Sequence, residues 1–326
     1  TQNGIRGGSA TVHFPIWHQE IEDIIVLKNN KGTEDNRVRK LDYSIQISKL
    51  FYERFIQDAE ISLFSPHDVP GLYDAFGTDK FDSLYTTYEQ DSSIPRKTIG
   101  AQELILDLLK ERAETGRIYI MNIDHCNEHS SFKDKVNMSN LCQEITLPTD
   151  PIQHIDGEGE IALCILSAIN VGKLRNLDEL EELCDLTVRA LDELIDYQGY
   201  PVDAARLSTL SRRSIGVGFI GLAHYLAKQG VKYEDPKAWQ LTHDLLKSSN
   251  KLAQDKGACG YFDSTKYSDG ILPIDTYKKD VDELVPNKLN YDWEELREDI
   301  LEYGLRHSTL SAQMPSESSS VVSNAT

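Results

Sequence analysis

The sequence predicts a mixed α/β fold with a mostly parallel sheet, and three observations support this prediction. Short segments with the alternating pattern of strands are interleaved with amphipathic helices along the whole chain. One strong helix ends at Gly116 and leads at once into an apolar strand, which is the order of an α/β unit. No long linker, low-complexity stretch or obvious repeat interrupts the alternation. The pattern therefore predicts one α/β domain and is compatible with a closed sheet.

Strands are expected where short runs of apolar and β-branched residues alternate or cluster. In chain order, these runs are residues 10–14, 43–47, 61–64, 117–121, 140–147, 160–169 and 309–314.

Helices are expected where apolar residues recur at steps of three and four. The clearest is 177–197, with Asn176 as its N-cap and the acidic Asp178 and Glu179 in its first turn. The other predicted helices are 17–29, 49–57, 98–115, 219–228, 238–256 and 293–302, and a further one begins within 315–320.

The composition is that of an ordinary globular protein. The chain has 326 residues, a formal net charge of −19, 40% hydrophobic and 27% charged residues. At roughly 150 residues per domain this length allows two domains, and a single α/β barrel fits equally well. The acidic balance argues against a broad nucleic-acid face, and no apolar run approaches the roughly 20 residues of a membrane span. We therefore expect neither nucleic-acid nor membrane binding.

The cysteines point to a reducing compartment. Five cysteines without a C-x-x-C pair do not make a disulfide scaffold in a chain of this length. No secretory signal is recognisable, so we expect reduced thiols and a cytoplasmic location. Because the chain starts at Thr1 within a glycine-containing loop and stops at Thr326, we expect it to be an internal piece of a longer protein.

Two motifs suggest chemistry that the rest of the sequence does not support. Residues 215–221 match the G-x-G-x-x-G pattern of dinucleotide sites, but no buried strand precedes them and no acid-terminated strand follows. The simpler interpretation is that the glycines let a helix pack closely on its neighbours. Residues 124–129 gather metal-capable side chains, yet no second ligand pair is present for a closed zinc site. A polar loop is favoured there, and no metal site is predicted.

The most informative stretch is 139–145, which reads Ser-Asn-Leu-Cys-Gln-Glu-Ile. If it is extended, Asn140, Cys142 and Glu144 lie on one face. An amide, a thiol and a carboxylate then point to the same place, which is unusual for a merely solvated face. The alternative is a half-buried strand with a polar face.

Two further segments allow both a structural and a functional interpretation. Cys164 lies in a nearly all-apolar predicted strand, where a buried inert thiol is the default, and a second cysteine on a neighbouring strand would favour redox chemistry. Residues 315–320 (Pro-Ser-Glu-Ser-Ser-Ser) begin a predicted helix. They are either an anion site or a helix start capped by Ser316.

Several motifs together resemble the large (alpha) subunit of class I ribonucleotide reductase, most closely its aerobic class Ia branch. The resemblance runs through essentially the whole chain in order. Its motifs are residues 37–39 with 42–43, 63–66, 69–73, 116–119, 139–145, 159–164 and 314–319. The resemblance implies that residues 1–326 are part of a ten-stranded α/β barrel made of two five-stranded halves. A finger loop that enters this barrel would carry Cys142 at its tip.

The resemblance also implies roles for individual residues. Cys142 would become a thiyl radical and abstract the 3′ hydrogen of a ribonucleotide, which is expected to be a diphosphate. Glu144 would be the general base on the 3′ hydroxyl, and Asn140 would hydrogen-bond the substrate hydroxyls. Cys164 would be one of two cysteines that reduce the 2′ position and end as a disulfide.

The same resemblance assigns two binding segments. The substrate phosphates would be held by backbone N–H groups and side chains at Pro315, Ser316, Glu317, Ser318 and Ser319. The opening loop, with Gln2 and Arg6, resembles the specificity loop that links the allosteric effector site to the substrate base.

The family pattern extends beyond this sequence. The dithiol partner of Cys164, the ATP-cone domain, the later barrel strands, the radical-transfer tyrosine pair and the C-terminal cysteines match no residue here. Cys126, Cys184 and Cys259 match no catalytic position and are interpreted as structural. We therefore expect this piece alone to be inactive in ribonucleotide reduction.

The resemblance further implies the partners. No cofactor is expected on this chain itself, because a metal-containing beta subunit would supply the radical, while ATP and deoxynucleotide effectors act on the full-length protein. Thioredoxin or glutaredoxin would be the reductant, and the large subunits would form a homodimer. Two alternatives remain: a non-catalytic barrel fragment that associates with a companion chain, and a nicotinamide-dependent dehydrogenase that uses residues 216–221.

Overall fold

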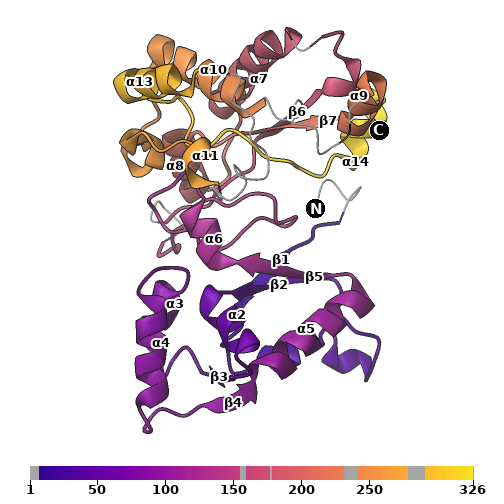
Figure 1. Cartoon of the computed structure of the whole chain (residues 1–326), viewed down its shortest axis with the longest axis vertical. Helices are drawn as coiled ribbons and strands as arrows, with labels where there is room; N and C mark the ends of the chain where they lie inside the picture. Colours follow the sequence, from indigo (N-terminus) through magenta and orange to yellow (C-terminus); the bar gives the residue numbers. More distant parts are fainter. Residues whose placement is uncertain are drawn as a thin grey trace. The chain divides into compact units, whose positions relative to one another are not determined.

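The computed structural model describes residues 7–154, 159–176, 178–230, 232, 241–277 and 291–325. The chain divides into two compact units (Figure 1). Unit 1 comprises Thr1–Ser130 and Val136–Thr146, and unit 2 comprises Ser131–Lys135 and Leu147–Thr326. Within the described ranges, no helix combines the length and the apolar composition that crossing a bilayer requires.

Unit 1 contains a three-stranded parallel sheet in the order β1-β2-β5. Its strands are β1 (Thr11–Pro15), β2 (Asp42–Ile47) and β5 (Ile118–Asn122). In register, Ser44 of the central strand lies opposite His13 on one side and Tyr119 on the other. A separate antiparallel pair joins β3 (Glu60–Leu63) to β4 (Lys97–Gly100). The helices of this unit are α1 (Ile21–Ile25), α2 (Lys49–Ile56), α3 (Leu72–Ala75), α4 (Phe81–Gln90), α5 (Ala101–Thr115) and α6 (Ile123–Glu128).

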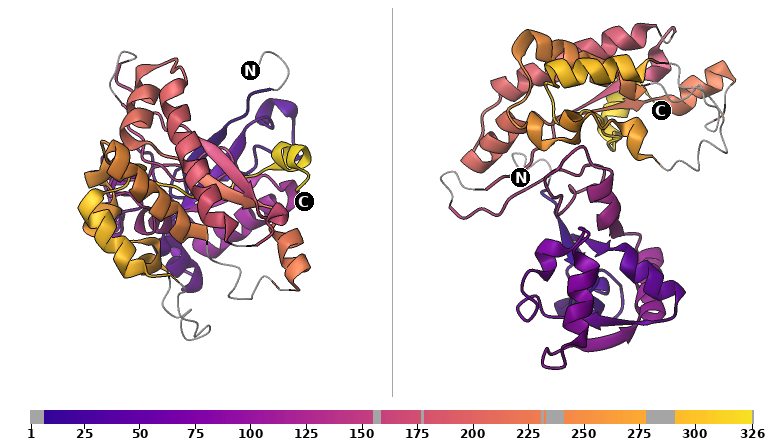
Figure 2. Two further views of the ribbon diagram at one scale, coloured as in Figure 1. Left: turned by 90° about the horizontal axis from the view of Figure 1, so that it is seen from above. Right: turned by 60° about the vertical axis from the view of Figure 1, so that its left-hand side comes forward.

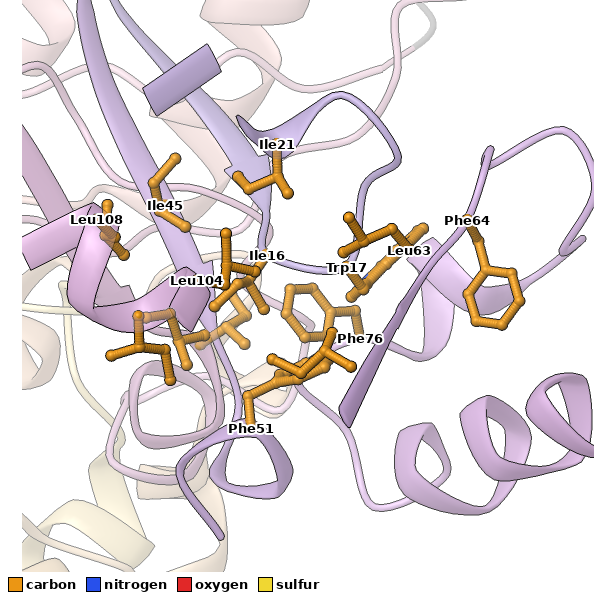
Figure 3. Close-up of a cluster of buried hydrophobic side chains, with 14 of the residues drawn as sticks. Ile16, Trp17, Ile21, Ile45, Phe51, Leu63, Phe64, Phe76, Leu104 and Leu108 are labelled. Carbon is orange, nitrogen blue, oxygen red and sulfur yellow. The ribbon is translucent and has the colours of Figure 1, made fainter. Parts of the chain in front are cut away.

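One apolar core holds unit 1 together. The odd-numbered residues of β2 are apolar and belong to this core, and α2 and α5 pack beside each other against it. Figure 3 shows Trp17, Phe51 and Phe76 among the buried side chains, with Leu104 and Leu108 of α5 nearby. Aromatic rings meet edge to face at Trp17–Phe76 and Phe51–Tyr85, a favoured arrangement. The buried phenol of Tyr85 accepts from the backbone N–H of Ser62 and donates to its carbonyl, which ties α4 to β3.

Unit 2 is built from helices around a short parallel pair, β6 (Leu166–Asn170) with β7 (Gly216–Ile220). Helix α10 packs against both α7 and α13, and the two views of Figure 2 show this group of helices. Of the stripe predicted for α7, Leu180, Cys184, Val188 and Leu191 are buried, whereas Leu183 is half-buried and Leu194 is exposed. The helix starts at Glu179, so Asp178 and not Asn176 occupies the N-cap position. The helices are α7 (Glu179–Tyr197), α8 (Asp203–Arg212), α9 (Leu222–Gln229), α10 (Leu241–Lys256), α11 (Pro273–Thr276), α13 (Trp293–Tyr303) and α14 (Glu317–Ser323).

The mixed α/β class and most predicted elements are confirmed. Strands are present at 11–15, 42–47, 60–63 and 118–122, and helices at 49–56, 101–115, 179–197, 293–303 and 317–323. The predicted helix 238–256 is helical from Leu241, and its first three residues lie outside the described ranges. The single barrel domain over residues 1–326, its closure and its finger loop remain predictions.

Four predicted elements are wrong in extent. The helix expected at 17–29 shrinks to Ile21–Ile25, because His18 bridges to Phe64 instead of entering a helix. The strand expected at 160–169 starts only at Leu166. The helix expected at 219–228 begins after Gly221, since Phe219 and Ile220 end β7. Residues 309–314 run beside β7 without forming a regular strand, with one bridge from Ser311 to Val217.

A buried carboxylate links several segments of unit 2. Asp192 of α7 is fully buried and lies 2.6 Å from Nε of Arg213 and 3.2 Å from Nε of Arg306. Lys256 and His307 each approach within 3.3 Å. Burial alone would raise the pKa of Asp192, but the hydrogen bonds and charges of His307 and Arg213 outweigh it and hold the pKa below its usual range.

We predict that Asp192→Asn destabilises the protein by about 3–5 kcal/mol, because the buried Arg213 and the partly buried Arg306 lose a fully buried counter-charge, while Arg213 keeps the half-exposed Asp196. Urea unfolding at neutral pH measures this loss. The stabilisation is complete above the ordinary aspartate pKa of about 3.9 and disappears as the pH falls through the lower folded-state pKa. The difference in the free energy of unfolding between Asp192→Asn and the wild type should therefore become smaller in acid.

Asp255→Asn is the matched control for this prediction. Asp255 pairs with Arg189 at 3.4 Å, but its side chain is 63% exposed. An exposed pair contributes about 0–1 kcal/mol, so this variant should unfold close to wild type. Equal losses in the two variants would contradict a special role for the buried carboxylate.

Candidate functional site

The candidate site of unit 1 is organised by a polar face of the parallel sheet. Along β2, Tyr43, Ile45 and Ile47 join the apolar core, while the residues between them are polar. Ser44 and Gln46 are nevertheless 0% and 1% exposed. Buried polar groups require hydrogen-bond partners, so a polar segment must cover this face. Residues 137–146 provide that cover.

The segment 139–146 closes into a tight loop. Ser139 and Thr146 form an antiparallel bridge at its base, and the hydroxyl of Ser139 donates to the carbonyl of Ile145 at 2.5 Å. At its other end the backbone N–H of Gln143 bonds to the carbonyl of Asn140 at 3.2 Å. Cys142 lies in this turn and is exposed. The strand predicted at 140–147 is therefore wrong, because backbone bonds within the segment replace those of a ladder.

The loop brings together two of the three residues that the extended interpretation placed on one face, Asn140 and Glu144. The side-chain amide of Asn140 donates to the carboxylate of Glu144 at 2.7 Å, and its oxygen accepts from the N–H of Ile145 at 3.1 Å. Four strand residues would separate the two backbones by roughly 13 Å, too far for this contact. The amide and the carboxylate thus flank Cys142 because the chain turns back at the thiol.

Side chains of the sheet hold this loop. His13 donates from Nε2 to the carbonyl of Ser139 at 3.0 Å, and Ser44 donates to Oε1 of Gln143 at 3.0 Å. Their neighbours extend the contact, since Thr11 donates to the carbonyl of Leu141 and Gln46 to that of Asn137. The loop is therefore fixed by hydrogen bonds and not by apolar packing.

The environment of the loop shifts two nearby titratable groups. Burial lowers the pKa of His13, and its hydrogen bond to Ser139 offsets this only in part. Its Nδ1 is buried with no hydrogen-bond partner among the described residues, so the neutral ring is favoured. Burial raises the pKa of Tyr119, with smaller contributions from Asp42, then Cys142 and Glu144. The Tyr119 phenol is therefore close enough to the loop for Cys142 and Glu144 to affect its pKa.

Cys164 belongs to unit 2 and lies just before β6. It is exposed, which contradicts the default of a buried inert thiol. The physical reason is that the apolar run 160–165 is irregular, so the alternation of a strand does not decide which side chains are buried.

The predicted phosphate segment opens α14. Ser316 occupies the N-cap position without a side-chain cap bond, and Ser318 and Ser319 are exposed. Pro315 and Glu317 are exposed as well. The hydroxyl expected to cap the helix is thus not used for capping. Gln2 and Arg6 lie outside the described residues.

The motifs at 215–221 and 124–129, which suggested a dinucleotide site and a metal site, have structural roles. Gly216 and Gly218 lie within β7 and not in a strand-to-helix turn. A Cβ on Gly218 would lie 2.4 Å from the carbonyl oxygen of Ala312, so the glycine permits close approach of a chain segment and not of a helix. In the other motif, the predicted polar loop is wrong, because residues 124–128 belong to α6, and Asp124 accepts from the N–H of Lys49 at the start of α2. No group of three metal-capable side chains is found among the described residues.

Sequence reasoning missed His13, Ser44 and Gln143 as parts of this site. A signal for them was present in β2. The central strand of a parallel sheet usually carries apolar residues on both faces, so polar residues alternating along it indicate a face covered by something polar. The positive φ of Gln143 had no such signal, because glutamine rarely adopts it.

Comparisons with known proteins agree with the resemblance seen in the motifs. A family model described as "Ribonucleotide reductase, barrel domain" matches residues 1–326. The alpha subunit of ribonucleoside-diphosphate reductase from Haemophilus influenzae is 59% identical across the whole chain. The corresponding proteins of Escherichia coli and of phage T4 are 56% and 46% identical over the same extent. The chain spans 45% of the length of each of these relatives.

We predict that a limiting alkylating reagent modifies Cys142 and Cys164 first, because both are exposed. Burial raises the pKa of Cys184 to about 12 and that of Cys259 to about 11, so both stay protonated at mildly alkaline pH. Peptide mass spectrometry of the labelled protein measures the order. Denatured protein, in which all five react alike, is the control, and early labelling of Cys184 in folded protein would contradict the structure.

Proposed function

Since this chain belongs to the ribonucleotide reductase barrel-domain family, we propose that it carries the catalytic loop for converting ribonucleotides to 2′-deoxyribonucleotides. The relatives' name, ribonucleoside-diphosphate reductase, favours diphosphates as substrates. The chain spans 45% of those relatives' length, so the activity is proposed for a complete subunit containing it. The synthesis of DNA precursors would be its purpose.

One observation carries this proposal. The amide of Asn140 and the carboxylate of Glu144 are 2.7 Å apart, and Cys142 lies in the turn that joins them. A ribose presents a C3′–H bond and two neighbouring hydroxyls, so it needs a hydrogen-atom acceptor, a base and a polar contact within a few ångströms of one another. The loop 139–146 supplies all three from eight consecutive residues.

The roles follow from the chemistry of each group. Cys142 loses its S–H hydrogen atom to the oxidant provided by the partner subunit, and the resulting sulfur radical takes the 3′ hydrogen of the substrate. Glu144 accepts the proton of the 3′ hydroxyl, while Asn140 hydrogen-bonds the hydroxyls. The 2′ hydroxyl then leaves as water. The hydrogen atom returns from Cys142 to C3′ at the end, so the thiol is regenerated.

The reduction itself needs two electrons and two protons. We propose that Cys164 supplies one half of a dithiol that provides them and ends as a disulfide. Its exposure, away from any apolar core, supports a reactive and not a structural thiol. The exposed serines at the start of α14 are proposed to hold the substrate phosphates together with the backbone N–H groups there. Gln2 and Arg6 are proposed to belong to the loop that senses the effector.

We also propose the architecture and the partners of the complete subunit. The three-stranded parallel sheet β1-β2-β5 and the parallel pair β6-β7 would contribute strands to a ten-stranded barrel, with residues 139–146 as its finger loop. A metal-containing beta subunit would supply the radical, so the chain would bind no cofactor of its own. Thioredoxin or glutaredoxin would reduce the disulfide. ATP and deoxynucleotides would act as effectors on a cytoplasmic homodimer of large subunits.

We expect Cys142→Ser in the complete subunit to abolish deoxyribonucleotide formation, because a hydroxyl does not replace the thiol as a hydrogen-atom carrier. The assay measures deoxyribonucleotide produced with the beta subunit and a thiol reductant present. Cys126→Ser is the control, since Cys126 lies on α6 and has no proposed role. Full activity in the Cys142 variant would refute the proposed function.

We expect Glu144→Gln to lower kcat by about 10²–10⁴-fold, the usual contribution of a general base. The amide cannot accept the 3′ hydroxyl proton, although it can still bond to Asn140. Substrate affinity, measured by equilibrium binding, should change little. A variant with normal kcat would remove Glu144 from the mechanism while leaving the role of Cys142 intact.

A further inference from the structure

Gln143, the residue after Cys142, adopts a backbone conformation that needs an external cause. Its φ is +69°, in the left-handed region that residues with a Cβ disfavour. No glycine or asparagine occupies this position, so the turn is not formed by local preference. Something outside the turn must hold it.

The side chain of Gln143 makes the contacts that can hold it. Its amide nitrogen donates to the carbonyl of Asn140 at 3.0 Å, which closes the turn around Cys142. Its amide oxygen accepts from the hydroxyl of Ser44 at 3.0 Å. One side chain thus closes the loop and anchors it to the sheet.

The sheet side of this anchor is rigid. Ser44 is 0% exposed and lies in the central strand, paired in parallel with neighbours on both sides. Beside it in register, His13 holds the base of the loop through the carbonyl of Ser139. The loop is therefore held at its base and on both sides of the thiol, by Thr11 at Leu141 and by Ser44 at Gln143.

We propose that Ser44 and Gln143 are positioning residues that fix the thiol of Cys142 relative to Asn140 and Glu144. The catalytic role of Cys142 rests on the proposed function, but the anchor itself does not. If the hydroxyl or the amide is removed, the peptide between Cys142 and Gln143 is free to leave the left-handed conformation. The thiol then loses its fixed direction while the sheet and the core of unit 1 remain.

The experiment measures the alkylation rate of Cys142 in the chain, peptide by peptide, with iodoacetamide from neutral to alkaline pH. Ser44→Ala removes the donor, and Gln143→Leu removes both contacts of the amide without favouring a positive φ. Each variant should raise the Cys142 rate at least about threefold, with the Cys164 rate unchanged. The double variant should match Gln143→Leu alone, because that substitution already removes the contact with Ser44. Ser44→Thr, which keeps the hydroxyl, should restore the wild-type rate.

Matched controls separate positioning from general loosening. Ser62→Ala removes another buried strand hydroxyl of unit 1, and Gln102→Leu removes an amide that bonds to the backbone of Phe55. Neither should alter the Cys142 rate. Wild-type Cys142 rates in Ser44→Ala and Gln143→Leu, effects that multiply in the double variant, or an equal rise at Cys164 would each overturn the proposal. Because no substrate is present, these outcomes are independent of whether Cys142→Ser abolishes activity.

Discussion

The structure of unit 1 depends on one requirement, that the polar groups buried on its parallel sheet must find hydrogen-bond partners. The central strand presents Ser44 and Gln46 on a face that water does not reach. Leaving either group unsatisfied would cost about 1–3 kcal/mol. The segment 137–146 supplies the acceptors, so its path is set by the sheet below it. The placement of the thiol, the amide and the carboxylate follows from this polar contact.

Much of the fold was predictable because its elements are encoded locally. The stripe of α7 and the glycine that ends α5 are short-range signals, and both are where the sequence placed them. The helix expected at 17–29 is short because the backbone of Trp17 and Gln19 bonds to Phe64, a residue distant in sequence. Tertiary packing there overrides a periodicity that is valid for an isolated segment. The β7 glycines were misassigned for a similar reason, since their neighbour is the distant segment around Ala312.

The candidate site was predictable in its members but not in its geometry. The spacing of Asn140, Cys142 and Glu144 suggested a shared face, and a hydrogen bond shows that Asn140 and Glu144 do converge. The structural reason differs from the predicted one, because a turn brings Asn140 and Glu144 into contact, whereas a strand would hold them apart. Nothing in the residues 139–145 reveals the turn, since its cause lies on β1 and β2. The spacing of residues within a motif does not predict a conformation that depends on hydrogen bonds from other segments of the chain.

The closure of this loop also limits how the region can vary. The bridge between Ser139 and Thr146 and the contact between Asn140 and Glu144 fix how many residues the turn contains. An insertion or a deletion between Asn140 and Glu144 would change the position of the Cys142 thiol relative to both of these residues. The length of the chain is therefore constrained here along with its side chains, and an engineered graft of this loop must be transplanted whole, together with the strands that bind it.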